Sequence, residues 1–157
     1  MSSSAPRRAA TLGRMTEISV YFNVPSRMAY ACRLLRRAHR EGVAVAVAGP
    51  ADALEEIDRE LWSFAAPEFL PHSRIERAGE VPQPLHATTI WLGENPIDAP
   101  LHSALLNLGP LPPPAFETFE RMFEIVSLDE DDREAARGRW KTYARRGYPI
   151  KRHEVAA

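Results

Sequence analysis

Apolar positions along the chain switch repeatedly between the spacing of strands and the spacing of helices. Residues 18–22 are β-formers that alternate in polarity, which predicts a strand. A helix is predicted from Pro25 to about Glu41, where apolar side chains recur along one stripe and Gly42 provides the stop. The unbroken apolar run 43–48 is typical of a strand that is buried on both faces. This order of elements predicts a right-handed parallel crossover.

The second half of the chain continues the alternation with shorter elements. We expect a helix at 52–61, strands at 88–92, 103–108 and 122–126, and a short helix at 115–120. The last helix should start at a capping box of Ser127 and Glu130 and run to about Arg146, before Gly147 and Pro149. The pattern therefore predicts one α/β domain with a Rossmann-like, mostly parallel sheet of five strands, flanked by helices.

The folded domain is expected to span residues 15–150. Residues 1–14 are rich in Ser, Ala and Arg without an acid, a weak likeness to a transit peptide that a disordered or mis-started extension explains better. Residues 151–157 are expected to form a flexible tail. Between residues 62 and 84, aromatics and prolines occur without periodicity, which indicates an ordered loop followed by a linker over 73–84.

The composition narrows the class of protein. With 45% apolar and 26% charged residues in a chain of 157, it matches one ordinary globular domain. A net charge of −1 argues against a protein that binds nucleic acid over its whole surface. The single cysteine, Cys32, leaves no disulfide framework and indicates a reducing, cytoplasmic location, with the thiol buried as an apolar group. No apolar run approaches the ~20 residues that span a bilayer, so no membrane partner is expected.

Familiar catalytic and ligand motifs are missing from the sequence. No glycine-rich phosphate loop follows the first two strands, and the turn 48–50 holds one glycine and a proline without an N–H. The five histidines lack metal-ligand spacing, and no GxSxG elbow occurs. We expect no enzyme activity, no cofactor and no metal. A hydrolase or transferase is a third hypothesis, which a deep cleft with shifted titratable groups at the strands' carboxyl ends would support.

The last thirty residues carry the most distinctive charge pattern. The acidic turn 129–132 precedes the segment 133–152, which holds eight Lys or Arg and one acid, and this asymmetry indicates a local anionic partner. Arg137, Trp140 and Lys141 are spaced i, i+3 and i+4, so they share a helix face. Two cations beside an aromatic ring can bind a carboxylate next to an apolar group. Alternatively, the face is solvated and Trp140 belongs to the core.

A second candidate surface is the irregular segment 62–72, which concentrates large apolar side chains. Either it plugs one edge of the core, or it forms a partner patch, because Trp and Phe in irregular segments are typical of interface hot spots.

Together these features resemble the chi subunit of bacterial DNA polymerase III. The resemblance runs from Met15 to about Tyr148. It is carried by Val20-Tyr21-Phe22, by Cys32 in a helix that ends at Gly42, by Leu61-Trp62 with Phe69-Leu70-Pro71-His72, and by Arg137-Gly138-Arg139-Trp140-Lys141-Thr142-Tyr143. It implies a Rossmann-like fold without a nucleotide site and a non-catalytic accessory subunit of the clamp-loader complex.

The resemblance also implies binding to the acidic C-terminal tail of single-stranded DNA-binding protein, which ends in aspartates followed by Pro-Phe. Arg137 and Lys141 match the positions that would meet the tail carboxylates. Trp140 stands where the family often has tyrosine, and with Val126 it would wall the pocket for the terminal Phe. Contact with DNA would then be indirect.

A second implied partner is the psi subunit of the clamp loader, for which Trp62, Phe69, Pro71 and His72 match the partner-facing segment. Chains similar to chi are more widespread than psi, so a helicase is an alternative occupant of this surface. The resemblance is compatible with a monomer or a heterodimer.

The alternative function is a direct single-stranded nucleic-acid-binding module. In that hypothesis the basic last helix meets phosphates, and Trp140, Tyr143 and Tyr148 stack on bases. The ligand discriminates the two hypotheses, because DNA alone should then bind and the tail peptide should not.

Overall fold

The computed structural model describes residues 15–63, 70–76 and 89–155. The strands are β1 (Glu17–Val24), β2 (Val45–Ala48), β3 (His72–Arg74), β4 (Ile90–Gly93), β5 (Ala104–Asn107), β6 (Arg121–Ser127) and β7 (Ile150–Glu154). The α-helices are α2 (Arg27–Arg40), α3 (Ala51–Ser63) and α4 (Glu130–Arg145). The strands form one sheet in the order β3-β4-β2-β5-β6-β1-β7, and every neighbouring pair is parallel. The predicted α/β class with a parallel sheet is confirmed.

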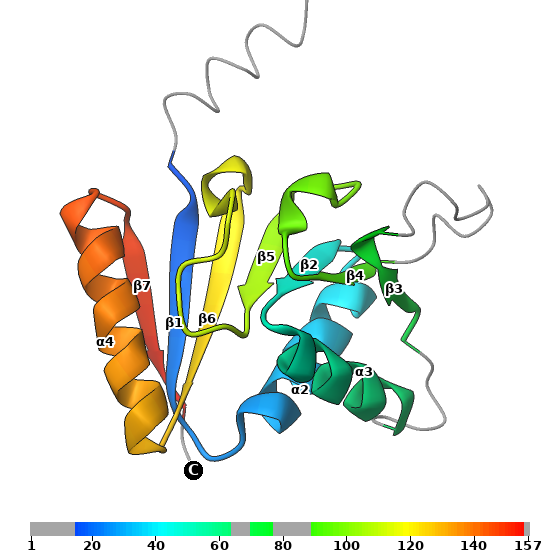
Figure 1. Ribbon diagram of the computed structural model, residues 1–157, viewed down its shortest axis with the longest axis horizontal. Coiled ribbons are helices and arrows are strands. Elements are labelled where there is room, and N and C mark those ends of the chain that lie inside the picture. Colours follow the sequence, from blue (N-terminus) through cyan, green and yellow to red (C-terminus); the bar gives the residue numbers. More distant parts are fainter. Residues whose placement is uncertain (1–14, 64–69, 77–88, 156–157) are drawn as a thin grey trace, which may run out of the picture.

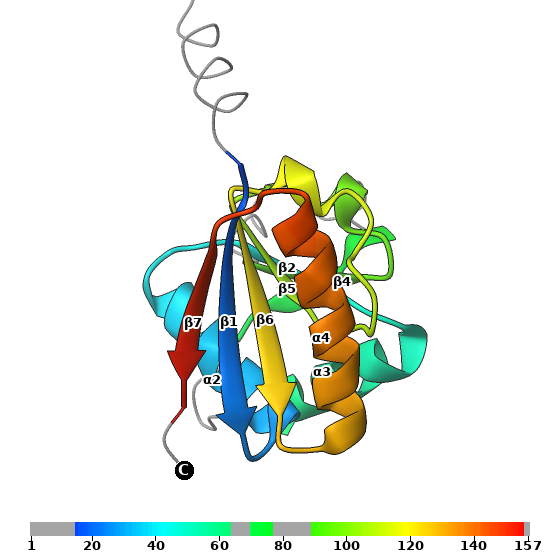
Figure 2. The same ribbon diagram turned by 90° about the vertical axis from the view of Figure 1, so that its left-hand side faces the viewer.

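Helices cover both faces of this sheet, and each face has its own core. α2 and α3 lie on one face, and α4 lies on the other (Figures 1 and 2). Strand β2 contributes alternate side chains to the two cores. Val45 and Val47 join the core under α2 and α3, while Ala46 and Ala48 join the core under α4. All four side chains are buried, as the unbroken apolar run predicted.

The sheet has two strands more than the five that the pattern predicted, and both are at its edges. β3 is three residues long, and β7 is a mostly exposed strand of charged side chains. Neither strand therefore shows the alternation of apolar and polar residues from which a strand is predicted. The expected flexible tail is wrong for residues 151–154, which pair with β1 through backbone hydrogen bonds. Similarly, Ser73 and Arg74 of the expected linker lie in β3, whereas 77–84 fall outside the described residues.

Local signals set the helix ends, with two corrections to the predicted elements. Ser26 caps α2 by accepting a hydrogen bond from the Ala29 N–H, and Gly42 follows the helix with φ of 74°. The predicted capping box at Ser127 is wrong, because Asp129 is the N-cap of α4 and accepts from the Asp132 N–H. The predicted helix at 115–120 is a 3₁₀ turn over Phe116–Thr118.

Cys32 faces the core from α2 and should be inert in the folded protein. Burial, with a smaller contribution from the Glu60 charge, raises the pKa of its thiol to about 12. Because only the thiolate reacts with thiol reagents, we expect slow modification near neutral pH and a rapid reaction once denaturant unfolds the chain. The rate of thiol modification by a chromogenic disulfide reagent, measured with and without denaturant, would test this expectation. Immediate stoichiometric reaction of the native protein would contradict the buried placement.

Candidate functional site

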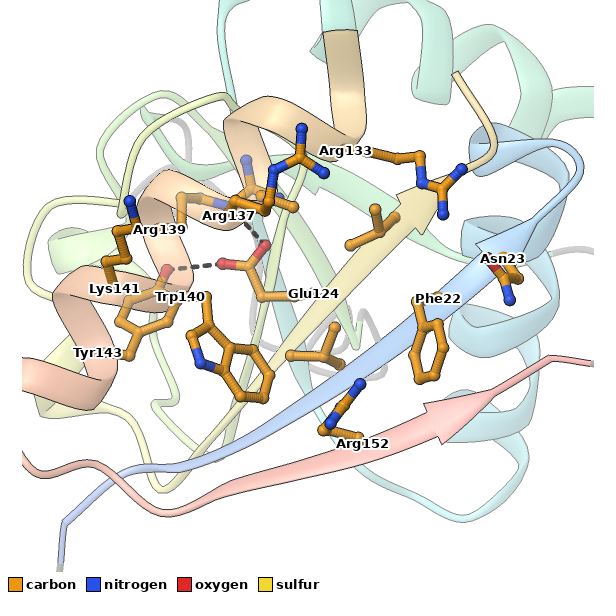
Figure 3. A pocket seen from close by; sticks show the side chains of 13 residues that line it. Phe22, Asn23, Glu124, Arg133, Arg137, Arg139, Trp140, Lys141, Tyr143 and Arg152 are labelled. Atoms are coloured by element: carbon orange, nitrogen blue, oxygen red, sulfur yellow. Dashed lines mark hydrogen bonds and ion pairs between the residues drawn. The ribbon is translucent and has the colours of Figure 1, made fainter. Parts of the chain in front are cut away.

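A pocket of about 470 Å³ opens between α4 and the strands β1, β6 and β7 (Figure 3). The four residues that the resemblance assigned to a tail-binding site all line it, and they are Val126, Arg137, Trp140 and Lys141. Val126 is buried on β6, Trp140 is partly buried on α4, and the two cations are exposed. The helical spacing of the α4 residues thus brings an apolar wall and two cations to one cavity, while the binding role remains a prediction.

The opposite wall comes from residues that sequence reasoning did not select. Val20 and Phe22 project from β1, and Arg152 projects from β7. The Arg152 guanidinium carbon lies 5.5 Å from the Phe22 ring centroid and 5.4 Å from that of Trp140, so it is held between two aromatic rings (Figure 3). Arg152 was missed because the segment beyond residue 150 was expected to be a tail.

One of the pocket cations already has an acidic partner. Arg137 donates to Glu130 at 2.9 Å, and both side chains are more than half exposed. This hydrogen bond, with the Arg137 charge, holds the pKa of the Glu130 carboxyl below its usual value. An exposed pair of this kind contributes little to stability, so a carboxylate of a ligand can exchange with Glu130.

Below the pocket, Glu124 of β6 is the acceptor at the centre of a buried polar network. It receives hydrogen bonds from Arg139 Nε at 2.8 Å, Tyr143 Oη at 2.6 Å and Asn107 Nδ2 at 3.0 Å. The Glu124 and Arg139 side chains are each 3% exposed. Burial, the Glu124 charge and the hydrogen bond to it raise the pKa of Tyr143, so its hydroxyl stays protonated and keeps donating.

This network also holds the proline-rich loop 109–114 against α4. Arg139 donates to the Pro110 carbonyl at 3.2 Å, and Asn107 donates to the Leu111 carbonyl at the same distance. The loop and the helix that carries the pocket cations are therefore fixed to one buried carboxylate, which orients the pocket face of α4.

The buried network removes two residues from the basic, aromatic surface that the sequence suggested. Arg139 is neutralised in the interior, and Tyr143 is 1% exposed. Tyr143 therefore offers no ring for base stacking, which weakens the α4 version of the nucleic-acid hypothesis. A glutamate inside the apolar run of β6, Met122 to Val126, was the available sequence signal for a buried cationic partner.

The second predicted surface lies at the end of α3, away from this pocket. Trp62 is 64% exposed, and its ring meets that of His72 edge-on at 5.0 Å. His72 is fixed by Asp58 at 2.8 Å and by the Leu70 carbonyl at 2.7 Å. Pro71 adjoins it and is partly buried, while Phe69 lies outside the described residues.

The carboxyl ends of the strands, where related folds bind nucleotides, are shaped differently here. Arg27 spans this edge by donating to the Leu108 carbonyl at 2.6 Å and to Asp132 at 3.1 Å. A Cβ on Gly49 would lie 3.2 Å from the Leu108 Cβ, so this glycine serves the close packing of two turns. The surrounding cavity is lined by five carboxylates, a charge that opposes phosphate: Asp52, Glu56, Asp129, Asp131 and Asp132.

In the part of the chain that the structure describes, no group of three or more His, Cys, Asp or Glu side chains is arranged to hold a metal ion. Among the same residues, no helix has the length and apolar character needed to cross a membrane.

Fold and pocket define an α/β protein with an apolar cavity that is lined by several cations. The model of the family described as "DNA polymerase III chi subunit, HolC" matches residues 15–151. A DNA polymerase III subunit chi from Pseudomonas aeruginosa is 33% identical over 147 residues, covering 90% of this chain and 98% of the relative. Another from Haemophilus influenzae is 28% identical over 126 residues, covering 80% and 85%. The chain therefore belongs to the family of DNA polymerase III chi subunits.

Proposed function

We propose that this chain is a non-catalytic accessory subunit of the polymerase III clamp-loader complex, and that it binds the acidic C-terminal tail of single-stranded DNA-binding protein. The observation that carries the proposal is the α4 pocket, in which an apolar cavity is surrounded by cations. Family membership supports the place in a replication complex.

The pocket chemistry suits a peptide that ends in acidic residues and a terminal Phe. Val20, Val126, Phe22 and Trp140 supply apolar and aromatic surface for a ring. Cations surround that surface from two elements, and they are Arg133, Arg137, Lys141 and Arg152. The tail carboxylates would be attracted from a distance, and the ring would supply the selective, short-range contact.

Arg152 adds a feature that fits a carboxylate ligand. Its planar guanidinium is oriented by the rings of Phe22 and Trp140, so little side-chain freedom is lost when a carboxylate binds. A site of this size should bind one tail weakly, on the order of micromolar. Several tails on one assembly of single-stranded DNA-binding protein would raise the effective concentration.

The peptide itself provides the direct test. A labelled tail peptide should bind in fluorescence anisotropy, weaken as salt rises, and lose most affinity when its terminal Phe is deleted. A scrambled peptide of equal charge controls for nonspecific attraction. Equal affinity for the tail, the scrambled peptide and the truncated peptide would contradict a site built around a ring.

For the second surface, we propose that Trp62, Phe69, Pro71 and His72 contact another subunit, the psi subunit or alternatively a helicase. The exposed Trp62 supports this, because a large aromatic side chain exposed at the end of a helix is typical of an interface anchor. The His72 ring is held by Asp58 of α3 and by the Leu70 carbonyl, so the ring that backs Trp62 has a fixed orientation.

A further inference from the structure

The sheet face opposite the α4 pocket carries a second concentration of aromatic rings, near the β7 edge. Tyr21 of β1 lies at its centre, and its ring centroid is 4.7 Å from that of His153, 5.5 Å from Tyr30 and 6.3 Å from Phe123. These four residues, the ring cluster, come from β1, β7, α2 and β6. Because side chains alternate along a strand, His153 points away from the pocket that receives Arg152.

Cations lie directly on this cluster. The Arg33 guanidinium carbon is 5.4 Å from the Tyr30 ring centroid, and that of Arg121 is 5.9 Å from the Phe123 centroid. Burial raises the pKa of Tyr21, while the positive charges of Arg37 and Arg121 act in the opposite direction. Helix α2 carries five arginines and no acid, so this face is locally basic.

The acids that face the cluster do not cancel this charge. Glu17 pairs in register with Arg121, and Glu41 lies 3.5 Å from Arg37 in a largely exposed pair. Lys151, two residues before His153 on β7, adds an exposed cation on the same side. Four Lys or Arg residues therefore stand against two acids.

The rings remain partly accessible. Tyr21, Tyr30 and Phe123 are half-buried at the rim of the α2 core, and His153 is exposed. The His153 ring stacks on Tyr21 with an interplanar angle of 17°, so one ring face is covered and the other is turned outward. An outward ring at the end of a stack can extend that stack by one more planar group.

We propose that the ring cluster and its cations form a weak binding surface for single-stranded nucleic acid, separate from the α4 pocket. Unpaired bases can stack on His153, while phosphates meet Arg33, Arg121 and Lys151. An acidic peptide with a terminal ring suits the apolar cavity beside α4, an acidic peptide without an aromatic side chain would leave the ring cluster unused, and a duplex would keep its bases inaccessible. A single strand is the occupant that uses both features.

This surface differs in position from the earlier nucleic-acid hypothesis. On α4, Tyr143 and Arg139 are buried, whereas α2 and the β7 edge offer rings and cations together. Helices α4 and α2 lie on opposite faces of β1, β6 and β7 (Figure 2), and each site lies on the face of one of them, so a tail and a strand could be held at the same time. The inference does not depend on the proposed tail binding.

The test measures anisotropy of a fluorescein-labelled oligothymidylate of about 16 nucleotides with the full chain at low and moderate salt. We expect weak binding that decreases with salt, as release of counterions from phosphates requires. His153→Ala should weaken it by roughly tenfold, the range expected for one lost stacking contact, while His153→Phe should retain it. Arg33→Ala with Arg121→Ala should weaken it further and lower the salt dependence.

Matched variants identify the face. Arg145→Ala and Lys141→Ala each remove a positive charge on α4 and should leave oligonucleotide binding nearly unchanged. The proposal would be overturned if the oligonucleotide did not bind at low salt, or if a duplex bound equally well. It would also be overturned if Lys141→Ala reduced oligonucleotide binding and the double arginine variant did not. Weaker binding of the tail peptide to the double arginine variant would instead assign this face to an acidic peptide, and would also overturn it.

Discussion

Replacing Glu124 by alanine should lower the free energy of unfolding by about 3–5 kcal/mol. The change leaves Arg139 as a buried charge without its carboxylate, and it removes the acceptor of Tyr143 and Asn107. Breaking a buried ion pair from one side is costly because the remaining charge keeps its desolvation penalty. Chemical denaturation followed by fluorescence or circular dichroism would measure the loss as a lower midpoint at similar slope.

The matched control removes a carboxylate from an exposed pair. Glu130→Ala breaks the contact with Arg137, where both side chains are more than half exposed, and should leave the denaturation midpoint nearly unchanged. Glu124→Gln keeps an oxygen acceptor but not the charge. Its loss of unfolding free energy should be intermediate between those of Glu124→Ala and Glu130→Ala. If Glu124→Ala were as mild as Glu130→Ala, the network would not be the element that holds α4 and the proline-rich loop.

Much of the fold could be predicted because the spacing of apolar residues along the sequence indicates which side chains are buried. The run 43–48 reads as a strand without a polar face, and the structure places it in the sheet interior as β2. The stripe on α2 predicted the buried face that includes Cys32 and Leu35. These signals are local, so one sequence suffices to detect them.

The edge strands could not be predicted, because little burial accompanies them. β7 is stabilised by backbone pairing with β1, and its side chains Lys151 to Glu154 are exposed. A strand of this kind has the composition of a tail. Because β7 was not predicted, the predicted site lacked Arg152, which forms part of the pocket wall.

The pocket itself was half predictable. Helical spacing placed Arg137, Trp140 and Lys141 on one face, and the structure brings them to one cavity with Val126. The burial of Arg139 could not be predicted from the same segment, because its partner Glu124 lies fifteen residues away on β6. Charge on a helix thus predicts a surface only after its long-range partners are known.

Trp140→Ala should weaken binding of the tail peptide by about 1–3 kcal/mol, because it removes a wall of the apolar cavity and one of the two rings that orient Arg152. Anisotropy titrations of wild type and variant would measure the loss. Trp62→Ala is the matched control, since it removes an exposed tryptophan from the other surface and should leave tail affinity unchanged.

Lys141→Ala separates charge from the apolar contact at the same pocket. Lys141 is exposed, so its removal should leave the denaturation midpoint nearly unchanged while costing about 1–3 kcal/mol of tail affinity. Its effect should shrink as salt rises, whereas the Trp140→Ala loss should persist, because salt screens charges but not ring burial. Folded Lys141→Ala and Trp140→Ala proteins that both bound the tail normally would remove the tail from this pocket. Losses with the same salt dependence would mean that the ring acts only by holding the neighbouring cation.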